Sequence, residues 1–181
     1  MSSETEKILA GPVDTSGMTQ QEIEELNMKV VQAHFHNENP ESVDKAIALY
    51  ADDVVWEAPM RGLVITDPAE IKKSYLGIFN TVHFNRTIGL RRFAKGDYVF
   101  DDQIVDLTVV GDQMPNLGFK PGERISARLL HIFEVKNGRI KREIAYEMTR
   151  AWGGPRDHDF IGPDAVYTEF PDGPDFGNWE K

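Results

Sequence analysis

Residues 124–150, RISARLLHIFEVKNGRIKREIAYEMTR, form the stretch that decides the fold. The runs 124–136 and 139–150 are rich in β-branched, apolar and aromatic residues, as strands are. Between them, Asn137-Gly138 supplies two residues that tolerate a positive φ angle, which a type I′ turn requires. The stretch is therefore predicted to form two antiparallel strands joined by a tight turn.

The same composition continues upstream of this hairpin. Residues 84–95 and 98–110 predict two more long strands, and residues 54–60 predict a short one. Residues 111–123, which contain two prolines and three glycines, predict a longer loop before the hairpin.

Three helices are predicted ahead of the long strands. Thr19 and Glu22 have the spacing of a capping box, and His34 lies on the apolar stripe of the helix that follows. Asn39-Pro40 and Asp67-Pro68 start two further helices, with proline at a first-turn position that needs no N–H. Helices followed by a run of strands predict an α+β domain.

Charge and composition exclude several classes of partner. Thirty acidic residues against twenty basic ones give a net charge of −10, which repels phosphate backbones and anionic lipids. We therefore expect no nucleic-acid and no membrane partner. The chain has no cysteine, and its first residues show no secretory pattern, so a cytoplasmic location is expected.

The chain divides into three parts by composition. Residues 1–17 are polar and predict a flexible arm, and residues 18–150 form the predicted domain. Residues 151–181 carry seven acidic side chains but also six of the 18 aromatic ones. A segment so rich in aromatic residues is expected to pack on the domain or on a partner subunit.

Motifs for phosphates, dinucleotides and activated serines are absent, and the five histidines include no helical HxxxH pair. We therefore expect neither a cofactor nor a dedicated metal site.

Two segments resemble a known superfamily. The stretch 48–59, ALYADDVVWEAP, with Val30-Val31-Gln32 before it, is similar to the opening of bacterial ketosteroid isomerases and SnoaL-like polyketide cyclases. The hairpin 131–140, continuing to Ala145-Tyr146, resembles their last two strands. The resemblance covers residues 20–150. It implies the nuclear transport factor 2-like (cystatin-like) fold: a curved antiparallel sheet and three N-terminal helices around a cone-like pocket, usually in a homodimer.

The resemblance also shows where the catalytic residues of these relatives would fall. The tyrosine of the isomerases matches His34, their base matches Ala58, and their protonated aspartate falls near Ala127. The cyclases carry a histidine where His131 stands, but their acid/base aspartate matches Ala145. The best-known carboxylates are therefore replaced, and any chemistry must use other groups.

Strand alternation suggests which groups those are. It directs Trp56, Ala58 and Met60 inward, together with two further sets: Leu129, His131 and Phe133, and Glu143, Ala145 and Glu147. His34, His131 and Glu147 are candidate acid/base or oxyanion groups, and Asp106 is a candidate base. The structural alternatives are a satisfied core histidine for His34, an arginine-paired sheet-edge carboxylate for Glu147 and an outward-facing one for Asp106. The candidate substrate-binding residues are Trp56, Met60, Tyr75, Phe79, His83 and Phe133.

Two functions are compatible with these patterns. The first is a cofactor-independent lyase or isomerase that acts on a small hydrophobic molecule of aromatic, steroid or polyketide type. The second is a non-catalytic module for small-molecule binding or dimerisation, which the two missing carboxylates favour.

Overall fold

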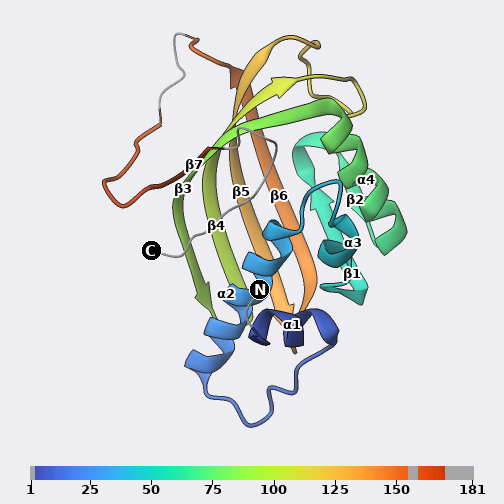
Figure 1. The fold of residues 1–181 in the computed structure, drawn as a ribbon, viewed down its shortest axis with the longest axis vertical. Helices are drawn as coiled ribbons and strands as arrows, with labels where there is room; N and C mark the ends of the chain where they lie inside the picture. Colours follow the sequence, from blue (N-terminus) through green and yellow to red (C-terminus); the bar gives the residue numbers. More distant parts are fainter. Residues whose placement is uncertain (1–2, 155–158, 170–181) are drawn as a thin grey trace.

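The computed structural model describes residues 3–154 and 159–169 (Figure 1). Its helices and strands, in chain order, are α1 (Ser3–Ala10), α2 (Gln20–His36), α3 (Val43–Ile47), β1 (Tyr50–Ala58), the 3-10 turn η1 (Pro59–Arg61), β2 (Leu63–Ile65), α4 (Pro68–Thr81), β3 (Val82–Lys95), β4 (Tyr98–Val109), β5 (Arg124–Lys136), β6 (Arg139–Ala151) and β7 (Val166–Glu169).

The strands form one curved, open sheet in the order β2-β1-β6-β5-β4-β3-β7. All neighbours are antiparallel except β1 and β6, which pair in parallel. Helices α2, α3 and α4 lie against one face of the sheet (Figure 1). The predicted α+β class and the curved sheet are confirmed, with one parallel pair that the sequence did not indicate.

The local signals that predicted the long elements have their expected geometry. The Thr19 side chain accepts from the Glu22 N–H at 3.3 Å, and Glu22 accepts from the Thr19 N–H at 2.7 Å. Asn137 and Gly138 have φ angles of 51° and 69°, and the turn they form joins β5 to β6. Capping and turn chemistry therefore act here as they do in isolated motifs.

The segment around the first strand differs from the prediction. Helix α3 has only five residues, and Tyr50 already belongs to β1. The strand ends at Ala58 because Pro59, which has no N–H for a sheet ladder, begins η1. Met60 therefore leaves the strand before alternation can direct it inward.

Part of the N-terminal segment packs on the hairpin. Residues 3–10 form α1, Ile8 is buried, and Arg139 donates to the Ile8 carbonyl at 2.9 Å. The Val13 N–H donates to the Asn137 carbonyl at 2.9 Å. Residues 3–10 of the segment expected to be a flexible arm are thus helical.

The described part of the C-terminal extension packs on the sheet. Strand β7 pairs with β3, and Asp159 forms ion pairs with Arg128, at 2.7 Å, and with Arg150. The Arg124 guanidinium stacks 4.1 Å from the centre of the Trp152 ring. Phe170, Phe176 and Trp179 lie outside the described residues.

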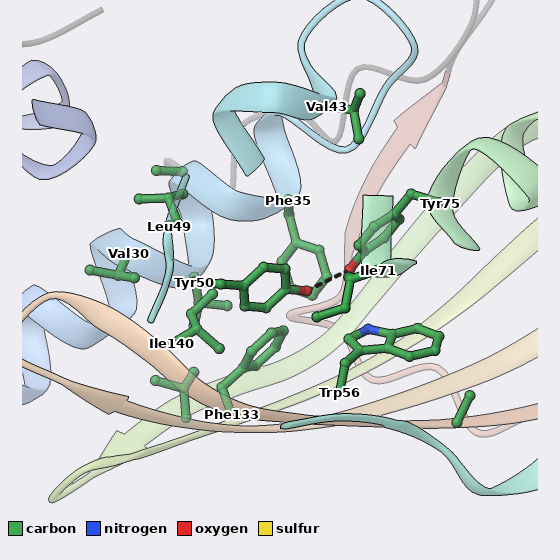
Figure 2. Packing of buried hydrophobic residues seen from close by; sticks show 14 of the residues in the cluster. Val30, Phe35, Val43, Leu49, Tyr50, Trp56, Ile71, Tyr75, Phe133 and Ile140 are labelled. Atoms are coloured by element: carbon green, nitrogen blue, oxygen red, sulfur yellow. Dashed lines mark hydrogen bonds between the residues drawn. The ribbon is translucent and has the colours of Figure 1, made fainter. Parts of the chain in front are cut away.

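The core fills the space between the helices and the concave face of the sheet. Figure 2 shows Val30 and Phe35 of α2 packed near Phe133 of β5, with Trp56 and Tyr75 beside them. In the described ranges no helix has the length and apolarity needed to cross a membrane.

Candidate active site

A pocket opens between the helices and the concave face of the sheet. Its walls are mainly apolar and include Phe35, Trp56, Tyr75, Phe79, Val82, Phe84, Leu107, Met114, Leu117 and Leu129. Its polar lining consists of Glu38, Gln103, His131, Glu143, Glu147 and Thr149. The cavity measures about 70 Å³. Because one water needs roughly 10–15 Å³ on this measure, the cavity has room for about five to seven waters.

Strand alternation explains which residues line the pocket. On β4, Gln103 and Leu107 face it, and on β6 the residues Glu143, Ala145 and Glu147 do so. His131 of β5 pairs directly with Ala145 of β6, so Glu143 is its diagonal neighbour on the same face. The inward face predicted for β5 and β6 is the one observed.

Glu143 is the centre of a buried polar cluster that also contains His34, Glu38, Tyr50 and Tyr75. His34 Nε2 lies 2.8 Å from Glu38 Oε1 and 3.3 Å from Glu143 Oε2. Tyr50 donates to Glu143 through a short hydrogen bond. Figure 2 shows the hydroxyls of Tyr50 and Tyr75 pointing toward one another, 3.0 Å apart.

The protonation states of the residues in this cluster depend on the charges and hydrogen bonds of the other residues in it. Burial would lower the pKa of His34, but the carboxylates of Glu38 and Glu143 outweigh burial and raise that pKa to about 10. Burial opposes ionisation of Glu143, yet its contacts with protonated His34 hold its pKa below the usual value. Burial and the adjacent carboxylates raise the pKa values of Tyr50 and Tyr75. At neutral pH the cluster therefore holds an imidazolium, ionised Glu143 and two neutral hydroxyls.

His131 forms a second polar unit beside this cluster. Its Nδ1 lies 3.3 Å from Asp101 Oδ2, and Arg92 donates to the other Asp101 oxygen at 2.7 Å. Burial would lower the pKa of His131, but the hydrogen bond to Asp101 and its charge raise it instead. Since Nδ1 faces Asp101, the Nε2 edge of the ring is the one left for the pocket. An aspartate that orients a histidine in this way prepares it to donate a hydrogen bond or a proton.

Glu147 lines the same pocket but is held in an ion pair. Arg61 donates to its Oε1 at 2.9 Å, and the side chain of Arg61 is itself buried. The Arg61 guanidinium lies 5.1 Å from the centre of the Trp56 ring. The arginine-paired alternative for Glu147 is thus realised, with a partner from η1 in place of the basic residues of the sheet.

Three predicted site residues lie elsewhere. Asp106 is directed to the opposite face of β4, where Arg124 donates to its Oδ1 at 2.8 Å and it lines a different cavity. Met60 is 58% exposed because η1 turns it outward. His83 is exposed and lines a separate pocket together with Phe79 and Phe84.

The remaining predicted residues divide between the wall and the layer behind it. Trp56, Tyr75, Phe79 and His131 line the pocket. His34 and Phe133 are fully buried behind that wall, with their ring centres 5.9 Å apart.

Four residues of these two polar units had no assigned role in the sequence analysis: Glu38, Tyr50, Asp101 and Glu143. One local pattern could have shown the first of them, since His34 and Glu38 have the i,i+4 spacing that lets a histidine and a carboxylate meet along one side of a helical segment. Tyr50 and Glu143 join the cluster through pairs 16 and 93 residues apart in the chain. No local spacing indicates such contacts.

A metal ion could in principle use His34, Glu38 and Glu143, whose ligand atoms lie within 4.8 Å of one another. His34 Nδ1 lies 3.3 Å from the Ala46 carbonyl, which only accepts, so Nδ1 carries a proton. With a pKa of about 10, Nε2 also carries a proton at neutral pH and directs it toward Glu38, so a metal ion would have to displace that proton.

Comparison with known proteins places this geometry in a family. The model of the SnoaL-like domain matches residues 31–143. A structure of an LEH-like epoxide hydrolase from M. tuberculosis is similar, with 21% identity, a TM-score of 0.53, and coverage of 69% of this chain and 84% of that one. An NTF2-like protein from Burkholderia xenovorans LB400 has 14% identity and a TM-score of 0.57, with coverage of 73% and 93%.

A third similar structure is a protein with a ketosteroid isomerase-like fold from Catenulispora acidiphila, at 14% identity, a TM-score of 0.52, and coverage of 65% and 83%. At these identities the structures establish the fold alone. A search of curated proteins finds no match. Because the family model covers more than half of the sequence, the chain belongs to the SnoaL-like domain family.

Proposed function

We propose that this SnoaL-like chain is a cofactor-independent lyase or isomerase that moves a proton in a small, largely apolar carbonyl compound. The observation that carries the proposal is the pairing of His131 and Glu143. These two side chains, an imidazole and a carboxylate, lie diagonally on adjacent strands and line the same apolar pocket.

Glu143 is the proposed base. Its carboxylate is ionised at neutral pH, so it can take a proton from a carbon next to the substrate carbonyl. The C–H electron pair then moves to the carbonyl oxygen and forms an enolate. Hydrogen bonds from Tyr50 and Tyr75 orient the carboxylate before the reaction.

His131 is the proposed partner of the carbonyl oxygen. Asp101 holds its ring so that Nε2–H can donate to the oxygen on which negative charge develops. Return of the proton to a different carbon completes an isomerisation, whereas loss of a leaving group from the neighbouring carbon completes an elimination. In this proposal the carboxylate of Glu143 on β6, two residues before Ala145, takes the place of the family carboxylates that match Ala58 and Ala145.

The pocket supports a small apolar substrate. Its wall is mostly aromatic and aliphatic, which suits an apolar ligand, and its volume of about 70 Å³ favours a small one. Larger aromatic, steroid or polyketide-like molecules would have to extend through the mouth of the pocket.

Deuterium exchange tests the proposal without knowledge of the natural substrate. Cyclohexanone, 2-cyclohexen-1-one and acetophenone are incubated with the protein in D₂O, and loss of the C–H signal next to the carbonyl is followed by NMR. We expect protein-dependent exchange with at least one compound. Glu143→Gln should reduce its rate by a factor of about 10² to 10⁴, which is the usual contribution of a general base.

Glu70→Gln is the matched control, because Glu70 is an exposed carboxylate near the start of α4. Equal exchange rates for wild type and Glu143→Gln would remove Glu143 from the mechanism. Binding of these compounds without exchange would favour the alternative function, a small-molecule-binding module.

The homodimer and the cytoplasmic location stay predictions, to be tested by sedimentation equilibrium and by fractionation of cells.

A further inference from the structure

The Tyr75 hydroxyl has a single proton but lies within hydrogen-bonding distance of two carboxylates. Its hydroxyl lies 3.2 Å from Glu38 Oε1 and 3.3 Å from Glu143 Oε1, and both contacts have the geometry of a bond that the hydroxyl donates. A hydroxyl has one proton to donate in a hydrogen bond, and its oxygen can accept up to two hydrogen bonds from other groups. Tyr75 can therefore donate to one acceptor at a time, either one of the two carboxylates or the Tyr50 oxygen 3.0 Å away, and the same oxygen can accept a proton from a protonated carboxyl group.

The two carboxylates differ in their access to water. The side chain of Glu143 is 2% exposed and that of Glu38 is 11% exposed. Glu38 follows the C-terminal end of α2, in the connection to α3, whereas Glu143 lies in the middle of the sheet on β6. Every other member of the cluster is less exposed than Glu38.

From this arrangement we propose that Tyr75 and Glu38 form the path by which protons travel between Glu143 and water. Glu143, once it has taken a proton, passes it to the Tyr75 oxygen while the Tyr75 hydroxyl proton moves to Glu38. Glu38 then releases a proton to water at the pocket mouth. At the end Glu143 and Glu38 are both carboxylates, Tyr75 again has one proton, and one proton has left the protein.

His34 favours transfer of the proton from Glu143 toward Glu38. Its Nε2 contacts both carboxylates, and its positive charge compensates one of the two negative charges. The contact with His34 holds Glu143 ionised, and a proton that arrives on Glu143 has a second carboxylate, that of Glu38, beyond Tyr75. In this scheme Glu38 and Tyr75 are relay residues, while Glu143 is the group that touches the substrate. The proposal rests on the proposed function for its purpose but not for its test.

The test measures proton exchange in the free protein. The low-field NMR signals of the His34 Nε2–H and the Tyr75 hydroxyl are followed in ¹⁵N-labelled protein, and their exchange with water is measured by magnetisation transfer. We expect Glu38→Gln to slow both exchange rates roughly tenfold or more, since a carboxylate that accepts the proton is replaced by an amide that cannot. Glu41→Gln is the matched control, because Glu41 is exposed and lies in the same connection.

Exchange rates in Glu38→Gln equal to those in Glu41→Gln would overturn the proposal. Glu38→Asp is the second variant. It keeps a carboxylate, so exchange is expected to return toward the wild-type rate, and an Asp variant as slow as Gln would also count against the path. A purely structural role for Glu38 would lower thermal stability without slowing exchange.

The deuterium assay separates this proposal from the proposed function. If the protein catalyses exchange, Glu38→Gln should lower kcat more than it raises KM. If the protein shows no exchange while Glu38→Gln still slows the NMR rates, the proposed function fails and the proton path stands.

Discussion

Replacement of His34 by glutamine tests the charge balance of the buried cluster. Glutamine has a similar size but no positive charge, so Glu38 and Glu143 would face one another without the cation that now lies 2.8 and 3.3 Å from them. A rise of the His34 pKa from 6.5 to about 10 corresponds to a stabilisation of about 5 kcal/mol at 1.4 kcal/mol per pKa unit. Removal of one partner from a buried ion pair costs about 3–5 kcal/mol. We therefore expect His34→Gln to lose about 3–5 kcal/mol of unfolding free energy near pH 6.5.

The loss should depend on pH in a definite direction. The folded pKa of His34 lies above its unfolded value, so its stabilisation is complete below pH 6.5 and disappears as the pH rises through about 10. The difference between wild type and variant should therefore shrink steadily from pH 6.5 to 10.

Urea denaturation followed by circular dichroism, at several pH values between 4.5 and 10, measures this difference. His36→Gln is the control, since His36 is exposed on the same helix. A loss below about 1 kcal/mol, which is typical of an exposed ion pair, would refute the reasoning. A difference that stays constant from pH 6.5 to 10 would also refute it.

Three further changes have defined outcomes. Asp101→Asn should lower the pKa of His131, because the hydrogen bond and negative charge that raise it are lost; NMR titration of the ring protons measures this, and an unchanged midpoint would contradict the assignment. Glu147→Gln should cost about 2–4 kcal/mol in urea denaturation by leaving the Arg61 guanidinium buried without a counter-charge, and a neutral effect would show that the pair is hydrated. Gly111→Ala should lower the melting temperature markedly, since its Cβ would lie 2.2 Å from the Asn80 carbonyl oxygen, and an unchanged melting temperature would show that this backbone can move.

Much of the frame follows from patterns that act over short distances. The Thr19–Glu22 capping box and the Asn137-Gly138 turn fixed the start of α2 and the pairing of β5 with β6. Strand alternation then placed His131 on the inner face of β5 and Glu147 on that of β6. Local predictions failed where a single residue ended an element early, as Pro59 does before Met60.

The sequence by itself determined the α+β class and the hairpin, because periodicity and turn chemistry depend on neighbours a few residues apart. The resemblance of two segments to SnoaL-like proteins indicated the family and an apolar pocket with histidines near it. Only the tertiary structure decided which carboxylate is the candidate base. Whether Glu143 or Glu147 is the candidate depends on which partner each meets: His34 and two tyrosines for one, Arg61 for the other. Those partners come from distant parts of the chain, and the pKa of a buried carboxylate is set by the charges and hydrogen bonds that surround it in space.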